Sequence, residues 1–187
     1  MQIRRKEYEE LISNVILDTI KVEQQMDAII AEYFCSDKQK ADEFSNMILF
    51  HERITFEFKK DIICNILNNN YKHFLKEHPT FLSLINKIPE HRNRFAHLIN
   101  LNNVERDEMI ASKGKIWSGL NPEVELKNPT IELIIFKRYK NGKPKYIGYA
   151  RFDFWAIQKN SLDVSSILFR FAMLIKGHPF PPFEQII

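Results

Sequence analysis

Residues 8–34 have the sequence YEELISNVILDTIKVEQQMDAIIAEYF, in which apolar side chains recur every three or four positions without an intervening glycine or proline. The apolar positions are Leu11, Val15, Ile16, Val22, Met26, Ile29, Ile30 and Tyr33. Side chains at this spacing lie on one face of an α-helix. The stretch therefore predicts one long amphipathic helix and favours a mainly α-helical fold.

Helical patterns continue after this stretch. Ser36-Asp37 is typical of a helix cap and predicts a second helix over residues 38–50. Residues 54–67 predict a third helix or a kinked continuation of the second, ended by Asn68-Asn69-Asn70. Residues 81–88 predict a short helix. Pro89 is suited to the first turn of a helix, so we expect a further helix from Pro89 to about Leu101.

A β-hairpin is predicted in the second half of the chain. Residues 131–140 and 143–152 are rich in β-forming residues and are joined by Asn141-Gly142, a strong hairpin signal. Pro144 has no N–H to donate, so the second strand is expected to be an edge strand at its start.

The segments on either side of the hairpin have different patterns. Residues 104–130 predict a loop, with one short strand over residues 115–117, and residues 153–176 return to helical spacing and predict a C-terminal helix. The expected fold is a mainly α-helical bundle with a β-hairpin, two or three short strands in all, inserted before the last helix.

Composition agrees with a single globular domain over residues 1–187, because 44% of the residues are hydrophobic and 27% are charged. We find neither a secretory signal nor an apolar run of membrane-spanning length, so we expect a cytoplasmic protein with no membrane partner. Cys35 and Cys64 are expected to be reduced thiols. The net charge is +3, and its basic excess lies after Asn103, which permits nucleic acid binding without requiring it.

Candidate chemistry is concentrated in residues 91–97, His-Arg-Asn-Arg-Phe-Ala-His. The guanidinium of Arg92 is a permanent planar cation suited to phosphate oxygens, and the imidazole of His97 exchanges protons near neutral pH. Such a pair can perform phosphoryl chemistry without a metal. On a regular helix Arg92 would share a stripe with Phe95 and Ala96, and this stripe should face the core.

The helical geometry also separates the two groups. Asn93 and His97 are four positions apart, where the amide could orient the imidazole. Arg92 and His97, however, are about 140° apart around a straight helix. A composite site across a two-fold axis would bring both groups to one phosphate.

The string from His91 to Ile99 resembles the signature of the HEPN superfamily (higher eukaryotes and prokaryotes nucleotide-binding), in which Arg and a polar residue precede His. Residues 22–34 and 54–60 look like the preceding helices of bacterial members, so the resemblance covers residues 8–103. It implies a helical bundle that forms a homodimer with the signature at the interface. Many members are metal-independent endoribonucleases of toxin–antitoxin and defence systems.

Matching positions give each residue an implied role. His97 would deprotonate the ribose 2′-hydroxyl, which attacks the phosphodiester and leaves a 2′,3′-cyclic phosphate. Arg92 would stabilise the growing negative charge, and Asn93 would hold the phosphate or the imidazole. No metal or cofactor is expected, and RNA, not DNA, would be the substrate.

The competing hypothesis is a non-catalytic dimeric module of the same fold, which binds a protein or nucleotide in a regulatory, scaffolding or antitoxin-like role. Arg92 would then make buried polar contacts and His97 would satisfy a neighbouring carbonyl. Duplex DNA binding is a weaker alternative, because no helix has a dense basic face.

Six cations are the candidate RNA-binding residues. Arg94 lies within the signature, and Lys137, Arg138, Lys140, Lys143 and Lys145 surround the hairpin turn. Aromatic residues are interleaved with the hairpin cations, a combination that suits single-stranded RNA. The alternative is a solvated hairpin tip whose lysines prevent edge-to-edge aggregation.

Overall fold

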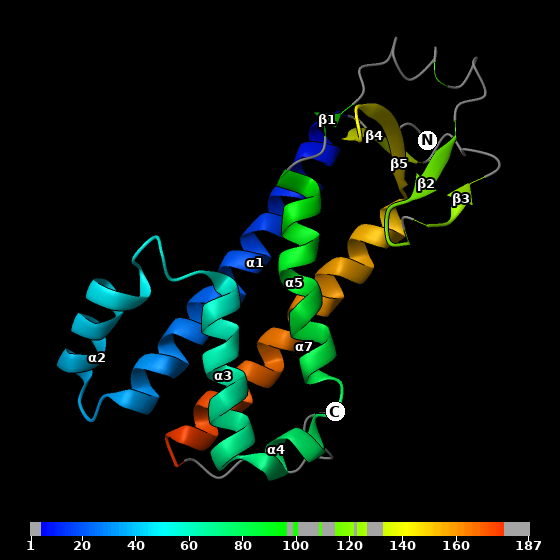
Figure 1. Cartoon of the computed structure of the whole chain (residues 1–187). Helices are drawn as coiled ribbons and strands as arrows, with labels where there is room; N and C mark the ends of the chain where they lie inside the picture. The colour runs from blue at the N-terminus through cyan, green and yellow to red at the C-terminus, as the bar shows by residue number, and fades with distance from the viewer. Residues whose placement is uncertain are drawn as a thin grey trace. The chain divides into compact units, whose positions relative to one another are not determined.

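The computed structural model describes residues 5–96, 99–100, 109, 115–121, 123–126 and 133–177. The described part is mainly helical, with a small sheet before the last helix, which confirms the predicted fold class (Figure 1). The helices are α1 (Arg5–Phe34), α2 (Lys38–Phe44), the π-helix η1 (Ser45–Leu49), α3 (Phe56–Asn70), α4 (Lys72–Glu77), α5 (Phe81–Ala96) and α7 (Arg151–Ile175). The strands are β1 (Ile99–Asn100), β2 (Ile116–Ser118), β3 (Glu125–Leu126), β4 (Ile134–Lys140) and β5 (Lys143–Tyr149).

The chain divides into two compact units. The sheet unit contains residues 1–16 and 90–159, and the helical unit contains residues 17–89 and 160–187. Helices α1, α5 and α7 each contribute residues to both units. The single domain expected over residues 1–187 stays a prediction.

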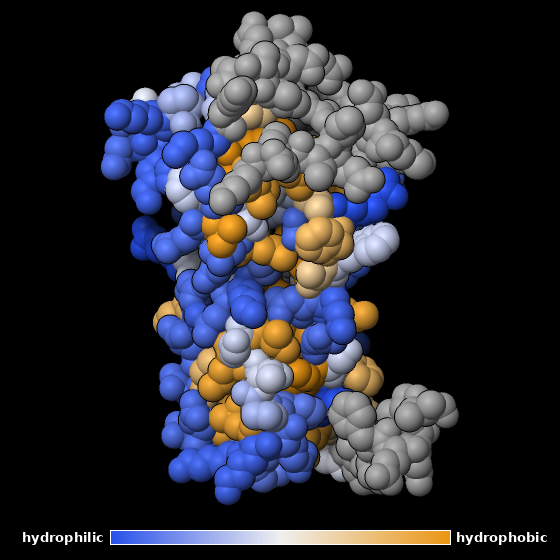
Figure 2. Space-filling model, turned by 90° about the vertical axis from the view of Figure 1, so that its right-hand side faces the viewer, coloured by the Kyte–Doolittle hydropathy of each residue, from blue (hydrophilic) through white to orange (hydrophobic). Residues whose placement is uncertain are grey.

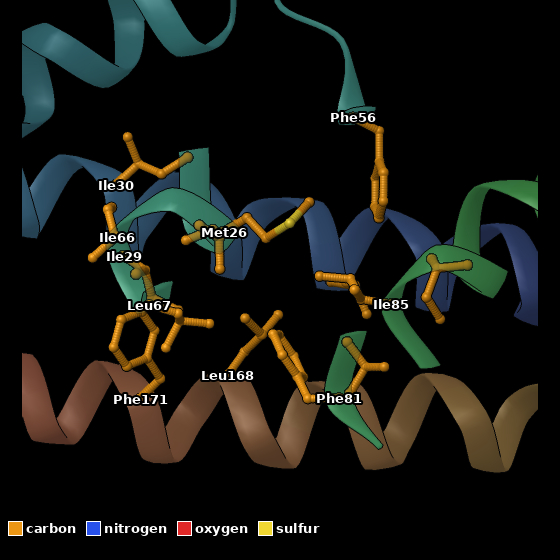
Figure 3. Packing of buried hydrophobic residues seen from close by; sticks show 14 of the residues in the cluster. Met26, Ile29, Ile30, Phe56, Ile66, Leu67, Phe81, Ile85, Leu168 and Phe171 are labelled. Carbon is orange, nitrogen blue, oxygen red and sulfur yellow. The ribbon is translucent and has the colours of Figure 1, made fainter. Parts of the chain in front are cut away.

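The core of the helical unit is built mainly from four helices, to which η1 adds Leu49 and α4 adds Phe74. Side chains from α1, α3, α5 and α7 meet in one apolar cluster (Figure 3). Met26 on α1, Leu67 on α3, Phe81 on α5 and Leu168 on α7 are all fully buried there. The predicted apolar face of the long N-terminal helix is confirmed, because Val22, Met26, Ile29 and Ile30 all lie in this cluster.

Side-chain caps determine where two helices begin. Asp37 accepts a hydrogen bond from the backbone N–H of Lys40 at 2.8 Å, so α2 starts directly after the predicted cap. Thr55 caps α3 by accepting from the N–H of Phe58 at 3.3 Å. The third predicted helix is confirmed, and it extends through the asparagines to Asn70.

Helix α5 differs from the prediction. The sequence predicted one helix that ends at Ile88 and another that starts at Pro89, whereas a single helix runs through Pro89 to Ala96. Proline in a helix interior removes one backbone hydrogen bond and crowds the carbonyl of the residue four positions before it, so burial must offset this cost. The buried positions continue on both sides of it, at Ile85, Ile88, His91 and Phe95, so packing of this face keeps the helix intact.

The sheet has five strands in the order β1-β4-β5-β2-β3, more than the two or three expected. The predicted hairpin is confirmed, because β4 and β5 pair antiparallel and the turn residues Asn141 and Gly142 have positive φ angles of 53° and 72°. Strand β2 pairs with β5 only from Tyr146 to Gly148. The start of β5 beside Pro144 is therefore an edge on that side, as predicted.

The stretch predicted as a loop, residues 104–130, contributes two strands. β2 confirms the short strand expected near Trp117, and β3 was missed. β3 pairs antiparallel with β2, with Ile116 opposite Leu126. Only two residues of β3 pair, too few for a recognisable alternation in the sequence.

A buried ion cluster joins α1 and α3 in the helical unit. The Nζ of Lys59 donates to Asp27 Oδ2 and to Glu23 Oε1, both at 2.9 Å. The side chains of Lys59 and Asp27 are only 4% and 6% exposed. Burial raises the pKa of Asp27, although the hydrogen bond and positive charge of Lys59 lower it.

Removing the buried cation is expected to destabilise the protein. Lys59→Met leaves the Asp27 carboxylate without its buried partner, which costs about 3–5 kcal/mol in the free energy of unfolding. Lys87→Met is the matched control, because Lys87 is exposed on α5, and it should change stability by less than about 0.5 kcal/mol. Urea denaturation measures both, and equal small effects would contradict a structural role for this cluster.

Candidate functional site

An aromatic cluster in the sheet unit holds the end of α5. The ring of Phe95 stacks on Phe154 of α7 with centroids 5.2 Å apart, and it lies 5.0 Å from Tyr149 and 6.2 Å from Phe136. Phe95 is only 4% exposed. Its burial fixes the rotation of α5 and therefore decides which residues of the signature face outward.

The inward-facing polar residue of the signature is His91, not Arg92. The sequence predicted Arg92 on the core-facing stripe with Phe95, but Arg92 is exposed and His91 is 8% exposed. His91 and Arg92 lie three and four positions after the buried Ile88, so either could continue the buried face of the helix. The sequence pattern alone could not distinguish them, and packing buries the imidazole rather than the permanent guanidinium cation.

Arg92 and Asn93 lie on the solvent-exposed side of α5. Within the described part of the chain, neither side chain has an ion-pair or hydrogen-bond partner. The buried polar contacts that a purely structural Arg92 would make are therefore not found among these residues. Its guanidinium N–H groups are available to an anion.

His97 lies outside the described residues, but its flanking segments are described. Helix α5 is described to Ala96 and β1 begins at Ile99, so the helix predicted to continue to about Leu101 is wrong at Ile99 and Asn100. Strand β1 pairs with the edge of β4, with Ile99 opposite Lys137, and this pairing supplies backbone hydrogen bonds in place of a further helical turn. The angle of about 140° expected between Arg92 and His97 on a regular helix stays a prediction.

Arg94 makes structural contacts that the sequence did not predict. Its Nη1 donates to the carbonyl oxygen of Gly119 at 2.7 Å, and its Nη2 lies 3.7 Å from Glu90 Oε2. The Arg94 side chain is 25% exposed. Gly119 has no room for a side chain, because a Cβ there would lie 2.3 Å from the ring of Tyr149. Arg94 thus ties α5 to a tightly packed turn after β2.

The cations of the hairpin are divided between two faces of the sheet. Lys140 pairs with Lys143, and alternation places these two with Lys145 on one face. The Nζ of Lys145 lies 4.2 Å from the centroid of the Trp117 ring, a cation–π contact on this face. We call Trp117, Lys140, Lys143 and Lys145 the lysine face.

The other hairpin cations are placed differently. Lys137 lies on the opposite face, with its Nζ 5.4 Å from the ring centroid of the exposed Tyr139. Arg138 pairs with Lys145 in the strand register, and its side chain lies outside the described residues. The predicted RNA-binding cations therefore do not form one continuous surface.

A separate cavity of about 880 Å³ lies in the helical unit. It is lined by α1, α2, η1 and the end of α7, and it contains none of the predicted site residues. Among the described residues there is no cluster of three or more His, Cys, Asp or Glu side chains arranged to hold a metal ion.

Comparisons with protein-family models, with curated proteins and with solved structures found no match. None of the described helices is both long and apolar enough to span a membrane.

Substitution of Arg92 and of Arg94 should affect stability to different extents. Arg94→Ala removes a charge-assisted hydrogen bond to Gly119 and should lower the free energy of unfolding by about 1.5–3 kcal/mol. Arg92→Ala alters an exposed position and should change it by less than about 0.5 kcal/mol. Thermal and urea denaturation of the two variants would reveal the difference, and a larger loss for Arg92→Ala would refute these assignments.

Proposed function

We propose that this protein is a metal-independent endoribonuclease of the HEPN type, whose site contains Arg92, Asn93 and His97. The observation that supports the proposal best is the exposure of Arg92 and Asn93 at the end of α5. Neither side chain is engaged by the described residues, while the neighbouring Arg94 is used to hold the structure. An exposed cation with no partner among the described residues is suited to binding a phosphate.

The proposed reaction is a transesterification within RNA. The imidazole of His97 takes the proton of a ribose 2′-hydroxyl, and the 2′ oxygen attacks the adjacent phosphorus. The bond from phosphorus to the 5′ oxygen breaks, that oxygen takes up a proton, and a 2′,3′-cyclic phosphate remains. Arg92 donates N–H groups to the non-bridging oxygens as their charge grows, and Asn93 orients the phosphate or the imidazole.

The proposal includes a homodimer. Two copies with their signatures facing each other would contribute both arginines and both histidines to one cleft, which is the arrangement that the HEPN resemblance implies. An exposed Arg92 is compatible with such a cleft, because a second copy can approach it. A function in a toxin–antitoxin or defence system, with an antitoxin or other regulatory protein as a further partner, is part of the same proposal.

The lysine face is proposed to bind the RNA. Strand β1 begins two residues after His97 and pairs with β4 at Phe136 and Lys137, so the strand that follows the signature belongs to the same sheet as the hairpin. Exposed lysines beside an aromatic ring offer phosphate contacts and a stacking surface. Substrate bound there would be held by the same unit that contains Arg92.

Cleavage of a labelled RNA tests the catalytic proposal. The wild-type protein should produce 2′,3′-cyclic phosphate ends in the presence of EDTA, and His97→Ala and Arg92→Ala should each reduce the rate by at least about 100-fold. The matched controls His73→Ala and Arg53→Ala alter exposed residues elsewhere and should retain full activity. Loss of activity in EDTA, or full activity in His97→Ala, would refute the mechanism.

An intact dimer with no turnover on any RNA would instead favour the non-catalytic module. In that case the same Arg92→Ala variant should weaken binding of a partner protein or nucleotide, which a pull-down or titration with the natural partner would detect. The two hypotheses therefore differ in turnover, not in fold.

The lysine face should affect substrate binding more than chemistry. Changing Lys140, Lys143 and Lys145 to alanine removes phosphate contacts and should raise KM by about tenfold or more at 150 mM salt, with kcat changed less than about twofold. The control changes Lys72, Lys76 and Lys87 to alanine in the helical unit. If both triple variants behave alike, the hairpin has no specific part in binding RNA.

A further inference from the structure

Helix α7 carries a second apolar face that the cores of the two units do not use. Large apolar residues at four positions of this face are strongly exposed: Phe152 is 65% exposed, Trp155 60%, Leu162 66% and Phe169 57%. The buried face of the same helix contains Phe154, Ile157, Val164, Leu168 and Phe171. Exposed hydrophobic surface is also visible between hydrophilic side chains in Figure 2.

The exposed residues follow a heptad repeat. Positions 152, 159 and 166 are seven residues apart, as are positions 155, 162 and 169, so the face consists of alternating a and d positions over about 26 Å of helix. Lys159 and Ser166 occupy the two remaining positions. We call these six residues the α7 stripe. Because α7 is one uninterrupted helix, the stripe does not depend on how the two units are placed.

We propose that the α7 stripe is a docking surface for the α7 helix of a second copy of this chain, in antiparallel orientation. Apolar residues at heptad spacing form a seam that fits another helix. The resemblance to HEPN proteins covers residues 8–103 and so gives no role to this helix. The inference is independent of the ribonuclease proposal, although it supplies a second copy.

The pattern along the stripe favours the antiparallel arrangement. When two stripes run in opposite directions about their midpoint, Phe152 lies opposite Phe169 of the second copy, and the large Trp155 lies opposite the small Ser166. Lys159 lies opposite Leu162 and beside Asp163 of the second copy. In a parallel pair Lys159 would face Lys159, and like charges at one position are destabilising.

Charge and area also agree with this occupant. Among the described residues neither Lys159 nor Asp163 has an ion-pair partner, so both are available across the interface. Three aromatic side chains and a leucine at this exposure present roughly 400–500 Å² of mostly apolar surface. A stable interface needs about 800 Å² from each partner, so these four side chains supply about half of it.

Sedimentation equilibrium of the whole chain tests the proposal. The wild-type protein should dimerise, and Leu162→Glu combined with Phe169→Glu should weaken the dimer at least about tenfold. Phe58→Glu, at a residue 53% exposed on α3, is the matched control and should leave the dimer unchanged. Far-UV circular dichroism verifies that each variant is folded. A monomeric wild-type protein at 100 µM, or a dimer that resists the double substitution, would overturn the proposal.

A charge exchange keeps the test decisive if the glutamate variants fail to fold. Lys159→Asp and Asp163→Lys should each weaken the dimer, because each places like charges side by side across the interface. The combined variant should restore it. Dimers unaffected by the single changes, or not restored by the combined one, would overturn the antiparallel pairing. RNA cleavage is measured separately, so loss of the dimer and absence of ribonuclease activity are distinct results.

Discussion

Burial of Phe95 is the constraint on which the candidate site depends. Its ring packs against Phe136, Tyr149 and Phe154, which belong to β4, β5 and α7. Removing a large aromatic side chain from such a cluster costs several kcal/mol, so the end of α5 has one strongly preferred rotation. That rotation buries His91 and exposes Arg92 and Asn93. The outward direction of the proposed catalytic cation is thus a consequence of aromatic packing in the sheet unit.

The fold was largely predictable where local signals were strong. The long helix, the cap at Asp37 and the Asn141-Gly142 turn follow from spacing and backbone preference, and the structure agrees with each of them. The errors concern long-range packing. Helix α5 continues through Pro89 because residues on both sides of it are buried. Ile99 and Asn100 form a strand because they pair with β4. Neither effect has a signal within a few residues of the position concerned.

The orientation of the candidate site residues was not predictable from the sequence. Arg92 and Asn93 were chosen for their chemistry, which stays a prediction, and the helical spacing had wrongly placed Arg92 on the core-facing stripe, whereas it is exposed. The role of Arg94 could not be predicted from the sequence, because its hydrogen-bond partner Gly119 lies 25 residues away. The face division of the hairpin lysines follows from strand alternation and could have been stated from the sequence. The α7 stripe could not be predicted from the sequence, because the sequence does not show which face of the helix packs in the core.

We propose that Arg92 and His97 contact an RNA phosphate, while Arg94 holds α5 to the turn after β2. The most direct test is an NMR titration of the protein with an RNA oligonucleotide that carries a 2′-deoxy substitution and so cannot be cleaved. The account predicts large shifts of the Arg92 side-chain Nε–H and the His97 ring signals, with the Arg94 signal nearly unchanged. Shifts confined to Arg94, or to neither arginine, would contradict it.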